Sequence, residues 1–133
     1  MPTLANITIK KADGTTDVVY TAIAGSAGDN VPAVFRNNTV GSTLAERPTL
    51  LVKSAWNSNR TSRRTRVDFS WPTVTTDAGG NKAITGRASG ECSFLAPQNQ
   101  DFATISEQAH QFGNLIASAI IKASFAEGYA PRS

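Results

Sequence analysis

The segment from Arg64 to Trp71 constrains the fold most, because its polar and largely apolar residues alternate. The two sets are Arg64, Arg66, Asp68 and Ser70 on one side, and Thr65, Val67, Phe69 and Trp71 on the other. Successive side chains of a strand point to opposite faces, so the segment predicts a strand with one charged and one apolar face. Such strands are typical of an antiparallel sheet that is wet on one side.

Similar signals predict about five further strands. Asn6–Lys10 and Val18–Tyr20 flank an Asp13-Gly14 turn and are expected to form an N-terminal hairpin. The meander that follows is expected to use Val34–Arg36, Thr49–Asn57, the alternating segment and Arg87–Ala96. Pro72 and Pro97 are expected to end their strands, because proline has no N–H for the ladder. The polar stretch Thr75–Thr85 between the last two strands is expected to be a loop.

After Pro97 the apolar residues recur at steps of three and four, which is typical of a helix. The stripe consists of Phe102, Ile105, Ala109, Phe112, Ile116, Ala119, Ile120 and Ala123. Asn99 is the expected N-cap, and Asp101 in the first turn complements the helix dipole. Gly113 and Asn114 either break the stripe or weaken it, and we expect two C-terminal helices. The predicted fold class is therefore α+β, with an antiparallel sheet of about six strands followed by two helices.

The chain has 133 residues, of which 40% are hydrophobic and 17% charged, and we expect one domain over residues 1–133. One helical segment cannot easily cover the whole apolar face of a single-layer sheet. A second copy that adds its own helices would complete the core, so dimerisation is expected.

The basic residues are concentrated in one stretch. Seven of the thirteen Lys and Arg residues lie between Arg36 and Arg66, where Glu46 is the only acidic residue. This concentration suggests an anionic partner, with nucleic acid as the leading candidate, and a solvated charged face is the open alternative. Lys53, Arg64 and Arg66 can share one polar face, although Leu51 would then share it too. Neutral donors and acceptors are expected from Asn57, Ser89 and Ser93.

Signals for catalysis or metal binding are weak. His110 is the only histidine and Cys92 the only cysteine, so a Cys/His metal site is excluded and no intrachain disulfide can form. Asp68 and Glu91 resemble a glycosidase pair only distantly, and charge balance with the neighbouring arginines is the better interpretation. We expect no enzyme activity, no cofactor and no bound metal. The N-terminal residues lack a signal-peptide pattern, and no apolar run approaches the roughly 20 residues of a membrane span, so a soluble protein that is not secreted is expected.

The order of these features resembles the coat proteins of the small single-stranded RNA phages, the leviviruses. The resemblance covers the full length and rests on the hairpin with Asp13-Gly14, the Asn57–Arg66 stretch, Pro72, Arg87, Pro97 and the terminal helices. It implies a dimer whose sheets join edge to edge and whose helices cross onto the partner. It also implies an icosahedral shell that packages single-stranded RNA and is assembled in the cytoplasm of a bacterial host. In some members the coat protein also represses translation by binding an RNA hairpin.

The resemblance implies that the polar face of the sheet lies against the RNA. The RNA-facing candidates are Lys53, Asn57, Arg64, Arg66, Asp68, Ser89 and Glu91. Ser89 stands where some relatives have a tyrosine that stacks on a base, and Asp68 stands where a basic residue is common. The stretch Thr75–Thr85 corresponds to a loop that gathers at the symmetry axes of the shell, with Gly79-Gly80 supplying flexibility.

Two alternatives remain open from the residues alone. The first is a cellular RNA- or DNA-binding β-domain that does not assemble. The second, more distant, is a small hydrolase that uses His110 or the carboxylates.

Overall fold

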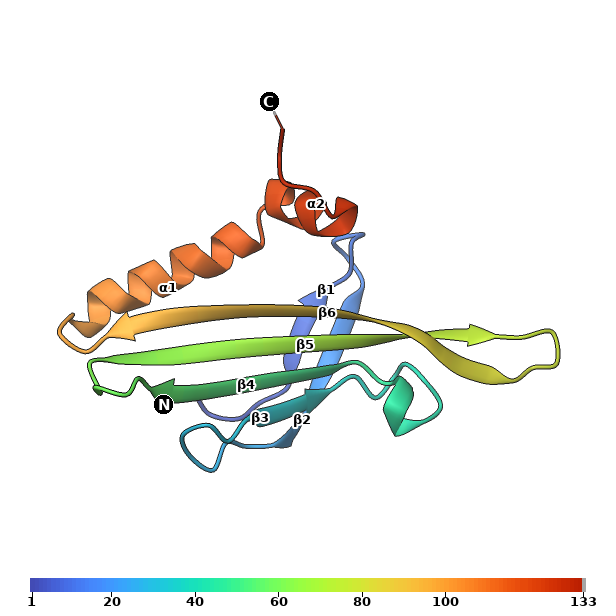
Figure 1. The fold of residues 1–133 in the computed structure, drawn as a ribbon, viewed down its shortest axis with the longest axis horizontal. Helices are drawn as coiled ribbons and strands as arrows, with labels where there is room; N and C mark the ends of the chain where they lie inside the picture. Colours follow the sequence, from blue (N-terminus) through green and yellow to red (C-terminus); the bar gives the residue numbers. More distant parts are fainter. Residues whose placement is uncertain (133) are drawn as a thin grey trace.

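The computed structural model describes residues 1–132 and has the predicted α+β architecture (Figure 1). Six antiparallel strands form one sheet in the order β1-β2-β3-β4-β5-β6, so β6 lies at an edge. The strands are β1 (Ile7–Lys10), β2 (Asp17–Ala24), β3 (Ala33–Arg36), β4 (Thr49–Trp56), β5 (Ser62–Thr76) and β6 (Lys82–Pro97). A short 3₁₀ turn, η1 (Leu44–Glu46), precedes β4, and the helices α1 (Phe102–Ile116) and α2 (Ala119–Glu127) follow β6.

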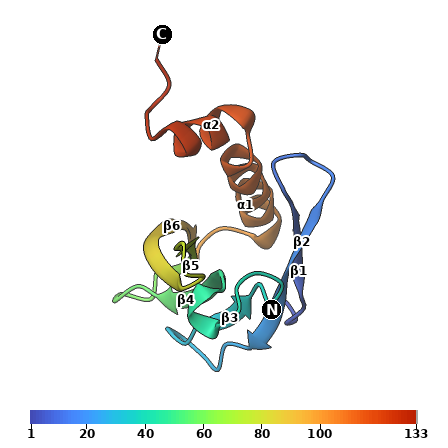
Figure 2. The same cartoon turned by 90° about the vertical axis from the view of Figure 1, so that its right-hand side faces the viewer.

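The sheet curls, so that the β1–β2 hairpin stands opposite strands β4 to β6 and α1 lies above the opening (Figure 2). The N-terminal hairpin turns at Gly14, whose φ of 72° suits glycine. Asp13 closes this turn by accepting hydrogen bonds from the backbone N–H groups of Thr15 and Thr16. The hydrogen bond from the Thr16 hydroxyl contributes most to lowering the pKa of the Asp13 carboxyl, and together with the two backbone bonds it brings this pKa to about 2.

A small core lies on the apolar face of the sheet. Its buried side chains are Val18, Tyr20 and Phe35, against which Leu50, Val52 and Phe69 pack among others. The rings of Tyr20 and Phe69 meet edge to face with 6.2 Å between their centroids. The expected division of β5 into a polar and an apolar face is confirmed, because Val67 and Phe69 are on the same side as this core.

The hydroxyl of Tyr20 has no hydrogen-bond partner within residues 1–132, and burial raises the pKa of this group. An unpaired buried polar group costs about 1–3 kcal/mol. We therefore expect Tyr20→Phe to leave the free energy of unfolding unchanged or to raise it by about 1 kcal/mol. Denaturant unfolding of both proteins would measure this, and a loss of stability in the variant would mean that the hydroxyl has a partner in the assembled protein.

Two boundaries in the sheet differ from those predicted. Pro72 does not end its strand: β5 continues to Thr76, with Pro72 opposite Arg87 in the ladder. A register shift follows directly, between Thr73 and Val74, and proline is tolerated next to such bulges. The predicted loop Thr75–Thr85 is also mostly strand, because only residues 77–81 form the turn between β5 and β6.

The turn at 77–81 is tightly closed rather than loose. The Asp77 carboxylate accepts hydrogen bonds from the backbone N–H groups of Gly79 and Asn81, at 2.9 and 2.8 Å. Gly80 adopts a φ of 80°, in the left-handed region that glycine enters without steric cost. The two strands therefore reach outward as one long hairpin (Figure 1).

The two C-terminal helices are confirmed, with different caps. Asp101, rather than Asn99, is the N-cap of α1 and accepts a hydrogen bond from the N–H of Thr104 at 3.2 Å. The first helix continues through Gly113 and Asn114, and the break falls at Ala117 and Ser118. A glycine weakens a helix by only about 1 kcal/mol, which is too little to end one.

The helices bury little of their apolar surface in the isolated chain. Neither α1 nor α2 contains a buried residue, and the main aromatic contact to the sheet joins Phe112 to Phe94, at 5.8 Å between ring centroids. Phe102 is 85% exposed and Phe125 69% exposed. None of the helices formed by residues 1–132 has the length and apolar character needed to cross a membrane.

Candidate nucleic-acid interface

The register of the sheet brings six of the seven predicted site residues onto one face. Lys53 is paired with Arg66, and Arg66 with Ser93, across three neighbouring strands. Residues directly opposite each other in an antiparallel ladder point to the same side. The expected position of Lys53 is therefore confirmed, and Leu51 does share the face, because it is paired with Asp68.

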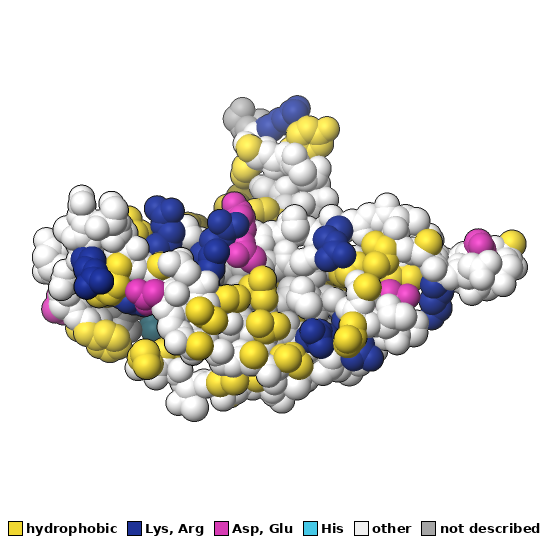
Figure 3. Space-filling model, turned by 60° about the horizontal axis from the view of Figure 1, so that its bottom comes forward, with side chains coloured by type: hydrophobic (Ala, Val, Ile, Leu, Met, Phe, Trp, Pro, Cys, Tyr) yellow, Lys and Arg dark blue, Asp and Glu magenta, His cyan; other side chains and the backbone are white. Residues whose placement is uncertain are grey.

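We call this side of strands β3 to β6 the polar face. It carries Arg36, Thr49, Leu51, Lys53, Arg64, Arg66, Asp68, Ser70, Arg87, Ser89, Glu91 and Ser93. Seen from below the view of Figure 1, the molecule has Lys and Arg side chains spread along its length, with apolar and a few acidic side chains among them (Figure 3). On such a face the cations can contact phosphates, and the other polar groups can contact base edges.

Arg66 is already paired within the chain. Its Nε donates a hydrogen bond to Oδ1 of Asp68 at 2.8 Å, and its Nη2 donates to Oε2 of Glu91. The hydrogen bond and charge of Asp68, followed by the charge of Glu91, raise the pKa of the Arg66 guanidinium. We call these three side chains the carboxylate bridge. The predicted charge balance of Asp68 and Glu91 with the neighbouring arginines is confirmed for Arg66, whereas Arg64 makes no ion pair with either carboxylate.

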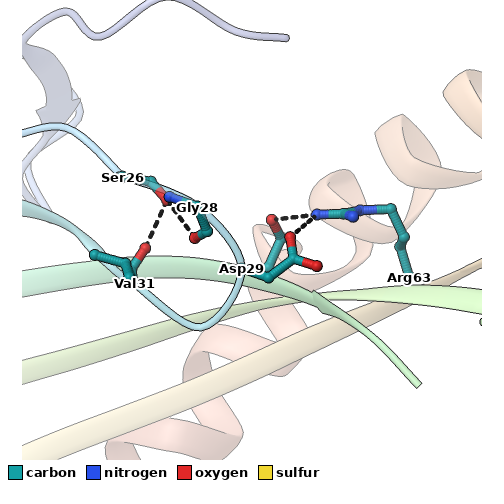
Figure 4. A network of polar contacts seen from close by, with 6 residues as sticks. Ser26, Gly28, Asp29, Val31 and Arg63 are labelled. Carbon is teal, nitrogen blue, oxygen red and sulfur yellow. Dashed lines mark hydrogen bonds and ion pairs between the residues drawn. The ribbon is translucent and has the colours of Figure 1, made fainter. Parts of the chain in front are cut away.

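Arg63 and Arg64 are adjacent in sequence but differ in their contacts. Arg63 lies on the opposite face, where its Nη2 donates to Oδ1 of Asp29 at 2.8 Å (Figure 4). Its guanidinium also lies 5.0 Å from the centroid of the Trp56 ring. Asp29 belongs to the loop at 25–32, which Ser26 closes by donating its hydroxyl to the carbonyl oxygen of Val31 at 2.6 Å (Figure 4). Arg63 therefore fixes the loop at 25–32 to the end of the sheet.

Among the basic groups of the polar face, Arg36 and Arg87 make no ion pair within residues 1–132, and neither do Lys53 and Arg64. Lys53 and Arg64 are the two of these that lie close together. They line one hollow of about 380 Å³ together with Arg66, Glu91 and Ser93, and Asn30 closes one side. Arg64 is exposed and Lys53 half-buried. Their charges are available to an anion that enters this hollow.

A second hollow of about 300 Å³ adjoins the first and has a different character. Thr49, Ser70 and Ser89 supply hydroxyl groups, and Leu51 supplies an apolar wall. Asp68 and Glu91 line this hollow as well, and Glu91 also borders the first one. The Nη1 group of Arg87 donates to the hydroxyl of Ser70 at 3.0 Å and orients it. This volume is at the lower end of the range for small-molecule sites.

Asn57 lies apart from the other six predicted site residues. It follows β4 and uses its side chain to close the turn to β5: its Oδ1 accepts from the N–H of Thr61 at 2.8 Å, and its Nδ2 donates to the Thr61 hydroxyl. The structure thus assigns Asn57 a local role, and its contact with RNA stays a prediction.

Arg36, Ser70 and Arg87 belong to the polar face but were not among the predicted site residues. Arg36 is paired with Thr49, in line with Ser70 and Ser89, and its Nε has no hydrogen-bond partner within residues 1–132. The alternation already placed Ser70 on the polar side of its strand, and the same parity along β6 could have placed Arg87 on this face. Arg36 could not be placed, because the pairing of β3 with β4 depends on the intervening loop.

The groups considered for catalysis are dispersed. His110 lies on the exposed side of α1, where Nδ1 is 2.7 Å from the carbonyl oxygen of Ser106. Cys92 is half-buried on the apolar face, opposite Val67. Within residues 1–132, no three His, Cys, Asp or Glu side chains gather closely enough to hold a metal ion.

Similarity to known proteins is detected at the level of the structure. No family model and no curated protein matches the sequence. The structure of the virus-like particle of Beihai levi-like virus 21 superposes with a TM-score of 0.81 at 20% sequence identity, covering 99% of this chain and 100% of that one. The coat protein of bacteriophage EMS014 gives 0.78 at 12% identity, covering 98% and 100%. The capsid protein of bacteriophage GA gives 0.70 at 11% identity, covering 94% and 95%.

The chain therefore has the fold of phage coat proteins over essentially its whole length. The resemblance to levivirus coat proteins that was inferred from the sequence is confirmed for the fold.

Proposed function

We propose that this chain is the coat-protein subunit of a small single-stranded RNA phage. In this proposal it is a structural protein without catalytic activity, which dimerises, assembles into an icosahedral shell in the cytoplasm of a bacterial host and packages RNA in the virion. The observation that carries the proposal is the match to coat proteins along the full length of both chains. A fold alone does not define a function, so the surfaces of the chain supply the rest of the argument.

The accessible surface supports an obligate dimer. A folded monomer of 14.1 kDa is expected to expose about 6,700 Å², whereas this chain exposes 9622 Å². The excess is about 2,900 Å² per chain, or about 5,800 Å² for two chains, which is at the upper end of the range that obligate homodimer interfaces bury in total. Much of it is apolar, since Phe102, Leu115, Ile120 and Phe125 are each more than half exposed. A second copy of the chain is the partner that covers these helices.

The free edge of the sheet supports the same arrangement. β6 is 16 residues long and pairs with β5 on one side only. A long edge strand of this kind is a template for pairing with another chain. Antiparallel pairing of two β6 strands around a two-fold axis would extend the sheet and bring the helices of each subunit onto its partner.

The polar face supports RNA as the packaged ligand. Lys53 and Arg64 are unpaired cations within residues 1–132, and hydroxyl groups and the carboxylate bridge lie beside them. Phosphates bind such cations, and unpaired bases can reach the polar groups between them. We keep Arg66, Asp68, Ser89 and Glu91 as RNA-facing candidates within this proposal.

Electron microscopy of the purified recombinant protein tests the proposal, with the absorbance at 260 nm recorded on the same fraction. Uniform closed particles that contain nuclease-protected RNA are the expected result. The competing function is a nucleic-acid-binding domain that does not assemble. A monomer or isolated dimer that stays free of particles under assembly-permissive conditions would favour that alternative and contradict the coat proposal.

A further inference from the structure

The edge strand β6 is bare on both faces as well as along its free edge (Figure 1). Every residue from Lys82 to Glu91 is exposed. Gly86 and Gly90 lie on the apolar side of this strand, and a Cβ placed on either would have no neighbour within 4 Å among residues 1–132, apart from the adjoining residues. An edge strand of this length is a template for another chain, and the register of the pairing decides which side chains meet.

The symmetry of the proposed dimer restricts this register. In such a dimer the helices of both subunits lie on one side of the joined sheet, so both polar faces lie on the other side. Residues directly opposite each other in an antiparallel pair point to the same side. The two-fold axis therefore passes beside a residue that is opposite its own copy in the partner, and not midway between two residues. The regular ladder of β6 extends from Gly86 to Pro97, on one side of the register shift between Thr73 and Val74 of β5.

Arg87 and Glu91 are the charged residues of this regular segment, and neither is neutralised within its own chain. Arg87 is exposed and makes no ion pair within residues 1–132. Glu91 shares the single guanidinium of Arg66 with Asp68, and its side chain is 67% exposed. Its second oxygen, Oε1, accepts no hydrogen bond within residues 1–132. The free edge thus carries an unpaired cation and an excess anion, four residues apart on the polar face.

One register brings these two charges together across the axis. With the axis at Ser89, Arg87 is opposite the partner's Glu91, and Glu91 is opposite the partner's Arg87. With the axis at Arg87 or at Glu91, a charge is opposite its own copy, which is destabilising. With the axis at Ala88 or Gly90, each charge is opposite an uncharged residue. Charge complementarity therefore favours Ser89 over the neighbouring positions.

The apolar side of β6 favours the same register independently. A run of small residues lies on this side with Ser89 at its midpoint: Gly86, Ala88, Gly90 and Cys92. With the axis at Ser89, Gly86 is opposite the partner's Cys92, and Ala88 is opposite the partner's Gly90. The small residues of both strands then form one flat floor at the axis. The exposed apolar side chains of α1 and α2, such as Phe102 and Phe125, gain room to cross it.

We propose that the two β6 strands of the dimer pair with Ser89 at the two-fold axis, and that ion pairs between Arg87 and the partner's Glu91 set this register. The inference rests on the proposed function and names the residues that make a second copy the specific partner. Each ion pair adjoins a carboxylate bridge and supplies its second cation. Opposite charges directly across two strands stabilise the pairing, and like charges destabilise it by a similar amount.

Two charge-reversed variants of the full-length chain, Arg87→Glu and Glu91→Arg, test the inference in a mixture. In either homodimer both inter-subunit pairs repel, whereas in the mixed dimer both attract. The two chains, distinguished by mass, are unfolded together and refolded without RNA, and native mass spectrometry counts the dimers. Random association gives about half mixed dimers. We expect mixed dimers to be favoured about thirtyfold beyond this statistical ratio, so that they exceed about nine-tenths of the total.

The mixture carries its own internal control, because contacts within a chain are the same in both kinds of dimer and cancel. A second mixture, Lys10→Glu with Asp17→Lys, controls for net charge. These residues are directly opposite each other within the β1–β2 hairpin, at the other edge of the sheet. Their reversal changes the net charge of each chain by the same amounts, and we expect about half mixed dimers.

A share of about half mixed dimers from the Arg87 and Glu91 variants would overturn the inference, as would an equal excess in the control mixture. A mixture that forms no dimer, although the unmodified chain does, would overturn it as well. These results leave the coat proposal intact, because they concern the register alone. An unmodified chain that stays monomeric would instead contradict the proposed function.

Discussion

A Phe125→Asp variant is expected to form no closed particles. Phe125 is 69% exposed on α2 in the isolated chain, so its side chain contributes little to the fold of one subunit. In the proposed dimer the partner covers it, and losing such a contact costs about 1.5–3 kcal/mol per subunit. A symmetric dimer contains the change twice, so its dissociation constant is expected to rise by roughly a hundred- to ten-thousandfold, before the cost of burying the new charge is added.

Size-exclusion chromatography with light scattering measures this change, and electron microscopy counts the particles. Phe125→Leu is the matched control, because it keeps an apolar side chain and is expected to assemble. Far-ultraviolet circular dichroism separates loss of dimer from loss of fold in the aspartate variant. Normal particles from Phe125→Asp would show that α2 faces solvent in the shell, contrary to the proposed dimer.

The double variant Lys53→Gln, Arg64→Gln is expected to reduce the salt dependence of RNA binding. Both cations line the first hollow, and neither makes an ion pair within residues 1–132. Each lost phosphate contact lowers the slope of log affinity against log salt by about 0.7 for a single strand. The slope should therefore become shallower by about 1.4 if both cations contact phosphates.

Titrations at several salt concentrations with a fixed oligonucleotide give the slope. The control is Lys10→Gln, Lys11→Gln, which removes the same charge from the β1–β2 hairpin and is expected to leave the slope nearly unchanged. A slope that falls equally in both variants would mean that only the net charge of the protein matters. In that case the polar face would not be the RNA-binding surface.

Local patterns were sufficient to predict the elements of the fold. Alternation in β5, the Asp13-Gly14 turn and the change of period after Pro97 each depend on near neighbours in sequence, and each was confirmed. The errors concern boundaries where tertiary contacts outweigh local preference. β5 continues through Pro72 because the ladder with β6 continues on both sides of it, and α1 continues through Gly113 because the cost of one glycine is small.

The sequence by itself determined the class of fold, the order of its elements and the sign of the charge on one face of the sheet. Only the tertiary structure decided which charges remain available. Arg66 is neutralised by Asp68 and Glu91, whereas Lys53 and Arg64, on the same face, have no acidic partner within residues 1–132. The reason is physical: alternation fixes the face of a side chain, but ion pairs depend on the register between strands, and register is a property of the whole sheet.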